Sequence, residues 1–235
     1  MVRVVHAGDF HLDSAFGALT PEQARQRRME SRRTPERLVE WANDHGADLL
    51  LLSGDLFDSD SPYGDTAPLL AQALGCFRGQ AVIAPGNHDP LTPDGPYART
   101  RWSDNVHIFT EDRMQTITFP DLNCAVHGAA FTAPECPTDS VLPGFRVPQD
   151  GLIHIGLYDL PGRALFHLFA DLCLRQLQFP GEHPDHRLRL LHLQGRQGDA
   201  AAAKDAGAGG VDDVAAQGAD IELGAQHIPR PIVVG

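Results

Sequence analysis

The sequence has few cysteines and no long apolar run, and each shortage excludes a class of protein. Its longest apolar stretches, such as "ADLLLL" and "GLIHIGL", are far shorter than the roughly 20 residues that a membrane-spanning helix needs. The first residues, "MVRVVHAGDF", enter a strand-like pattern without the basic and apolar regions of a signal peptide. The four cysteines lack CxxC spacing, which favours reduced thiols over a disulfide framework or a zinc ribbon. We therefore expect a cytoplasmic protein that does not enter a membrane.

Positive charge is also scarce, since 19 lysines and arginines face 31 acidic residues and give a formal net charge of −12. A protein that binds nucleic acid over a broad electrostatic surface is basic, so this balance argues against an architectural DNA-binding protein. The negative net charge is compatible with an enzyme that acts on phosphodiesters, because bound divalent cations reverse the local electrostatic field. The one basic segment, "ARQRRMESRRTPER", fits a solvent-exposed helix face with glutamate partners. A surface that steers phosphates is the alternative.

The first part of the chain alternates between strand and helix patterns. "VRVVHAGD", "ADLLLLSGD" and "QAVIAPGNHD" have the composition of buried strands that end in loops. Helical signals run from Thr20, an N-cap candidate followed by Pro21, to Gly46, and a further helix is expected near 65–77. Strands separated by helices indicate βαβ crossovers and a parallel sheet, hence an α/β fold.

The rest of the chain contains shorter elements. Helices are expected near 162–178 and 209–217, and no linker divides residues 1–235, which we interpret as a single domain. The expected strands are "NVHIF", "TITF", "NCAVHGAAF", "GLIHIGL", "HRLRLLHLQG", "ADIEL" and "PIVVG".

Each of the first three predicted strands ends in polar residues of the kinds that bind metals. Because the carboxyl ends of parallel strands line one crevice, these side chains should converge. Aspartate, histidine and asparagine suit manganese, iron or zinc, and a carboxylate that bridges two cations would serve a hydrolase with a dinuclear centre. The three clusters are Asp9 with His11, Asp55 with Asp58, and Asn87 with His88 and Asp89.

The motifs "DFH", "GDLFD" and "GNHD" resemble the signature of the calcineurin-like metallophosphoesterases. The sequence around these motifs, as in "HAGDFHLDSAF" and "VIAPGNHDP", is similar to that of the SbcD/YhaO branch, which are DNA-repair exonucleases related to the Mre–Rad nuclease subunit. The match covers residues 1–110, whereas 150–235 diverge. The resemblance implies a sandwich of two mixed β-sheets flanked by helices. The C-terminal capping domain of such nucleases would be absent from this chain.

The resemblance also implies a role for each motif residue. Asp9 and His11 would bind a first metal, Asp55 would bridge, and Asn87 would bind a second. His88 would be the general acid that protonates the leaving oxygen, and a metal-bound hydroxide would be the nucleophile. Asp89 would lie behind His88 and set its tautomer, and Asp58 is expected to order its loop rather than bind metal. The cofactor would be two divalent cations, with manganese favoured over magnesium, iron or zinc.

Two later family motifs, a strand ending in histidine and a G-H-x-H sequence, are harder to place. In "GLIHIGLYDL" the position of the expected ligand reads Tyr158-Asp159, and His154 lies inside the strand as a packed residue. His192 in "LRLLHLQG" is the better candidate for a second-metal ligand.

Near the end of the chain, His227 in "GAQHIPRP" aligns with the first histidine of the G-H-x-H motif and would complete the second metal site. Pro229 stands at its second histidine, so the first metal would lack one usual ligand.

We therefore predict a metal-dependent phosphoesterase, with a DNA-repair nuclease as the first choice. DNA would be its substrate and an SbcC-like ATPase its partner, and a homodimer is left open. The alternatives are a phosphodiesterase or phosphatase for small substrates, which the acidic charge favours, and an impaired relative that acts as a binding subunit.

Overall fold

The larger of two β-sheets carries the strands that the first motifs follow. The structure, a computed structural model, describes residues 2–135, 144–159, 187–194 and 216–222. Strands β1 (Val2–Gly8), β2 (Leu49–Ser53), β3 (Gln80–Ala84), β4 (Val106–Ile108), β8 (Arg187–Gln194) and β9 (Ala216–Glu222) form a sheet in the order β4-β3-β2-β1-β8-β9. All neighbours in it are parallel except β8 and β9. The predicted parallel crossovers are confirmed.

The second sheet has three strands, β5 (Gln115–Phe119), β6 (Cys124–Gly128) and β7 (Ile153–Leu157). β5 and β6 are antiparallel and are joined through the short 3₁₀ turn η1 (Pro120–Leu122), which Asn123 closes in the left-handed region. β6 and β7 are parallel. The two sheets are therefore both mixed, as the resemblance implied.

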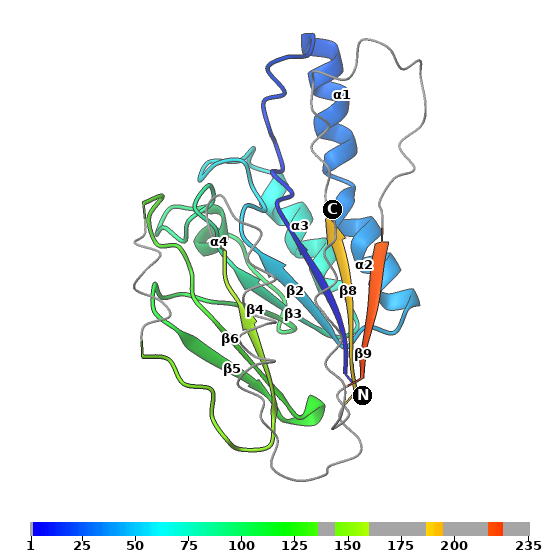
Figure 1. Cartoon of the computed structure of the whole chain (residues 1–235). Coiled ribbons are helices and arrows are strands. Elements are labelled where there is room, and N and C mark those ends of the chain that lie inside the picture. The colour runs from blue at the N-terminus through cyan, green and yellow to red at the C-terminus, as the bar shows by residue number, and fades with distance from the viewer. Residues whose placement is uncertain (1, 136–143, 160–186, 195–215, 223–235) are drawn as a thin grey trace.

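Strand β2 explains how the layers stack. Its alternate leucines point in opposite directions: Leu50 and Leu52 pack with residues of α2 (Thr34–Asp44) and α3 (Thr66–Gly75), while Leu49 and Leu51 pack with residues of β6 and β7. Figure 1 shows these helices on one side of the large sheet and the three-stranded sheet on the other. A strand covered on both faces is apolar at every position, which is why "LLLL" is uninterrupted.

The helical region between β1 and β2 is broken in two, unlike the single pattern expected. α1 (Pro21–Ser31) begins at Thr20 with a capping box to Gln23, and α2 starts again at Thr34, with Pro35 in its first turn. Gly46, in the left-handed region, follows the end of α2 as predicted.

α1 buries only Ala24 and extends beyond the ends of the strands (Figure 1). Arg25 pairs with Glu22, and Arg27 with Glu30. These pairs support a solvent-exposed helix face.

The predictions for the later part of the chain are confirmed only in part. The strand expected at "ADIEL" is confirmed as part of β9, which begins at Ala216. The helix expected near 209–217 is therefore wrong at residues 216 and 217, which belong to this strand. The helix near 162–178 and the strand "PIVVG" lie outside the described residues, and the single-domain organisation stays a prediction. Within the described parts of the chain, no helix is long and apolar enough to cross a bilayer.

Candidate metal centre

The loop after β1 runs alongside the loop after β2. The main-chain N–H of Asp9 donates to the carbonyl of Gly54 at 3.2 Å, and that of His11 donates to the carbonyl of Asp55 at 2.9 Å. Asp9, His11 and Asp55 all have positive φ, between 43° and 52°. Such a conformation is unfavourable for residues with a side chain and is retained where the surroundings impose it, often at functional sites.

These turns bring three of the predicted ligands together. One ligand atom from each of Asp9, His11 and Asp55 lies within 4.8 Å of the others. Asp55 is buried, and its Oδ1 accepts the main-chain N–H of His88 at 3.0 Å. The loops after β1, β2 and β3 thus meet at one carboxylate, as the parallel sheet predicts.

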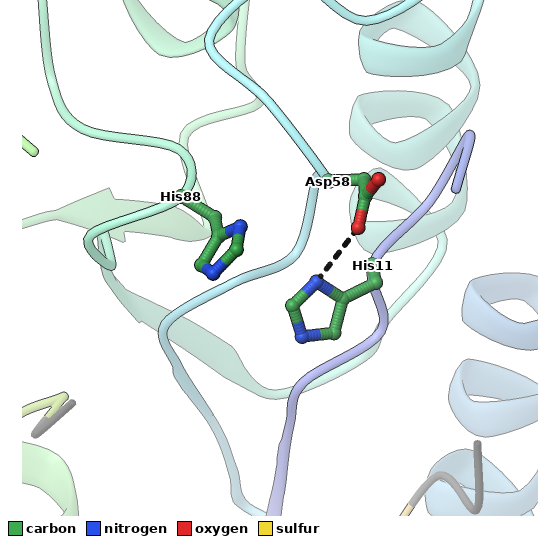
Figure 2. Close-up of side chains that lie close together, drawn as sticks. All are labelled: His11, Asp58 and His88. Carbon is green, nitrogen blue, oxygen red and sulfur yellow. Dashed lines mark hydrogen bonds and ion pairs between the residues drawn. The ribbon is translucent and has the colours of Figure 1, made fainter. Parts of the chain in front are cut away.

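His11 belongs to a second group of the same kind, formed with Asp58 and His88. Figure 2 shows the three side chains, which come from three different loops. His11 Nδ1 lies 3.1 Å from Asp58 Oδ1, its Nε2 lies 3.9 Å from Asp55 Oδ2, and its ring meets that of His88 edge-on at 5.1 Å. Because Asp58 holds Nδ1, Nε2 remains directed at the carboxylate of Asp55.

The carboxylate of Asp89 points into the protein, towards main-chain groups of the loops. Its carboxylate is fully buried and accepts main-chain N–H groups of Gly86, Asp55, Leu56 and Phe57 at 2.7–3.2 Å, and the hydroxyl of Tyr97 at 2.6 Å. Burial, the largest influence, raises its pKa to about 6 against these hydrogen bonds. Three of these five hydrogen bonds fasten the loop after β2 to Asp89 in the loop after β3, and the expected role of Asp89 in setting the tautomer of His88 stays a prediction.

Asp159 is a site residue that the sequence reasoning passed over. It follows β7, and its Oδ2 accepts the main-chain N–H of Asn87 at 3.3 Å. Burial first, and then the carboxylates of Asp55 and Asp9, raise the pKa of Asp159 to about 7. The signal was a polar residue directly after an apolar strand, the same signal that marked Asp9 and Asp55.

The later histidines are only partly described. The main chain of His192 lies on β8 beside His6 of β1, two positions before the level at which β1 ends, and its role as a ligand stays a prediction. His227 and Pro229 lie outside the described residues. His154 is buried, as expected, between His127 at 2.8 Å and Asp150 at 2.8 Å.

The donor set fits divalent cations. Carboxylates and imidazoles are ligands of manganese, iron and zinc. Within the described part of the chain, the ion pairs of Asp55 and Asp58 are with His11, and none joins Asp55, Asp58 or Asp159 to a lysine or an arginine. Negative groups brought together in this way are stabilised by a bound cation.

Carboxylates and imidazoles gathered at the carboxyl edge of a parallel sheet are typical of metal-dependent hydrolases. Residues 2–192 match the family model of the calcineurin-like phosphoesterases, and the chain belongs to this family. The membership and the donor set together support a metal-dependent phosphoesterase.

Two known proteins are similar to parts of the chain. Over 162 residues the chain is 33% identical to YhaO of Bacillus subtilis, an uncharacterized metallophosphoesterase, covering 65% of this chain and 39% of that protein. Over 94 residues it is 32% identical to one subunit of the nuclease SbcCD of Rhodobacter capsulatus, covering 38% of this chain and 22% of the relative. The chain therefore spans well under half the length of either relative.

Proposed function

We propose that the protein is a nuclease that hydrolyses phosphodiester bonds of DNA with two divalent cations. The observation that carries this proposal is the convergence of Asp9, His11 and Asp55 within 4.8 Å, with His88 beside them. Asp9 and His11 would hold one cation, Asp55 would contact both, and Asn87 would hold the other. The similarity to a nuclease subunit supports DNA as the substrate.

His88 would transfer a proton to a leaving oxygen. It is exposed, whereas Asp55 is buried, and its main chain is fixed by the hydrogen bond to Asp55. An exposed imidazole at the edge of the site can reach a bound phosphodiester and transfer a proton to its leaving oxygen. Bound cations would supply positive charge to the phosphate oxygens and lower the pKa of the attacking water.

The preferred metal follows from the same side chains. Oxygen donors outnumber imidazoles among Asp9, His11, Asp55 and Asn87, which favours manganese over zinc. Magnesium and iron are the remaining choices for such a site.

A phosphodiesterase for small substrates is the second candidate. The net charge of −12 favours this second candidate, because an acidic protein repels a long polyanion such as DNA more strongly than it repels a small ester. An ATPase partner is proposed only with the nuclease, because the relative is named as one subunit of SbcCD.

One experiment separates these functions. The purified protein is assayed with manganese on linear duplex DNA and on bis(p-nitrophenyl) phosphate. Hydrolysis of both substrates supports the nuclease, whereas hydrolysis of the small ester alone supports the second candidate. Hydrolysis of neither, with manganese bound, indicates a binding subunit.

A further inference from the structure

Asp159 reaches the metal centre from the other layer of the molecule. It directly follows the buried pair Leu157 and Tyr158 at the end of β7, in the three-stranded sheet, while the other proposed ligands follow strands of the large sheet. Its hydrogen bond to the main chain of Asn87 connects the two layers at the site.

Two glycines leave the space that the carboxylate of Asp159 occupies. A Cβ atom added at Gly54 would lie 2.3 Å from Cγ of Asp159, and one added at Gly86 would lie 2.8 Å from its Oδ2 and 2.5 Å from Oδ1 of Asp55. All three distances are shorter than normal contacts of a Cβ atom, so a side chain at either glycine would force the carboxylate of Asp159 or Asp55 to move. The loops after β2 and β3 are therefore shaped around this carboxylate, and they hold it beside Asp55.

The charges around Asp159 favour a positive partner. Asp55, Asp9 and Asp89, all acidic, are among the groups whose charge acts most strongly on it. Among the described residues, no lysine or arginine forms an ion pair with Asp159. A largely buried, ionised carboxylate among others is unfavourable, and a cation between them stabilises it.

We propose that Asp159 is a ligand of the second divalent cation, the one assigned to Asn87, and that it makes this position selective for metals that prefer oxygen donors. The inference rests on the metal centre of the proposed function but not on its substrate. With a carboxylate, the second position favours manganese or magnesium, whereas a histidine there would favour zinc.

The test uses the full chain and measures metal binding directly. Manganese and zinc are titrated by calorimetry into the metal-free wild type, Asp159→Asn, Asp159→His and the exposed control Asp121→Asn. We expect two manganese sites in the wild type and the control. Asp159→Asn should weaken one of them by at least about tenfold and leave the other unchanged. Asp159→His should shift that site towards zinc by a similar factor.

A second measurement separates a ligand from a merely structural residue. Without metal, Asp159→Asn should unfold at the same or higher urea concentration than the wild type, because the repulsion among carboxylates is relieved. Added manganese should then stabilise the variant less than the wild type. A ligand role is overturned if Asp159→Asn binds both cations within twofold of the control, or if the wild type binds none.

The result is independent of the substrate. Two manganese sites that respond to Asp159, with no cleavage of DNA, would leave this inference standing while the nuclease fails.

Discussion

Tyr97 donates its hydroxyl hydrogen to the carboxylate of Asp89 at 2.6 Å, beneath the loops that carry the metal ligands. Both residues are buried, and the carboxylate accepts four main-chain N–H groups besides this hydroxyl. The acid in "GNHD" is thus an anchor that fixes the main chain of Asp55 and the residues after it. The positions of the proposed ligands depend on these hydrogen bonds of Asp89, because they fix Asp55, which connects all three loops.

Asp89→Asn should destabilise the protein by about 2–4 kcal/mol. Each carboxylate oxygen accepts at least two N–H groups, so either orientation of the amide places its NH₂ against donors. Urea unfolding measures the loss. Tyr97→Phe removes one donor only and should cost about 1 kcal/mol. Equal stabilities of Asp89→Asn and the wild type would contradict the anchor.

His88→Ala should lower turnover by about 10²–10⁴-fold while leaving the metal content nearly unchanged. Its imidazole is assigned to proton transfer, and the proposed ligands remain in place. Metal per chain and the rate on a phosphodiester are measured together, with the exposed His45→Ala as control. Loss of a metal along with activity would make His88 a ligand, in accord with its position in the group with His11 and Asp58.

Asp58→Asn should weaken metal binding at His11 by about 10–100-fold. Asp58 fixes the ring of His11 through Nδ1, so the variant releases the orientation of Nε2 towards Asp55. Calorimetric titration with manganese measures the change, and Asp60→Asn, exposed in the same loop, is the control. An affinity equal to that of the control would show that Asp58 only orders its loop.

His127 should make the protein less stable in acid. It is buried between Thr116 and His154, and burial, then His154, lower its pKa to about 4, while Asp150 raises it slightly. An unfolded histidine titrates near 6.5, so the unfolded chain binds more protons between these values. Stability from neutral His127 is present above about pH 6.5 and is lost as the pH falls towards 4.

The comparison is made with His127→Gln, which does not titrate. The difference in unfolding free energy between wild type and variant should fall by about 2 kcal/mol between pH 7 and pH 5. Contributions of Asp89 and Asp159, whose raised pKa values act in the opposite sense, cancel in this difference. A difference independent of pH would mean that His127 has the same pKa in the folded and the unfolded protein.

The sequence predicts the first three ligand loops because their strands are neighbours in one parallel sheet. Asp9, Asp55 and His88 then converge by a general property of such sheets. The break after Ser31 was missed, since Thr34 and Pro35 suit the start of a helix but do not force one inside a continuous polar pattern.

The roles of Asp89 and Asp159 depend on tertiary structure. Asp89 lies next to His88 in the sequence, but its carboxylate turns inward to main-chain groups of another loop. Asp159 reaches the site only because the second sheet packs on the first, so its position after an apolar strand marks it as a polar residue at a strand end but does not predict its neighbours.

The most direct test of the metal-dependent phosphoesterase is the rate of phosphodiester hydrolysis as a function of manganese, in the wild type and in Asp55→Asn. Asp55 is proposed to contact both cations, so its replacement should affect the whole centre. The account predicts a rate that rises with manganese, disappears with EDTA and falls by about 10³-fold or more in the variant. A rate indifferent to EDTA, or equal in the two proteins, would contradict it.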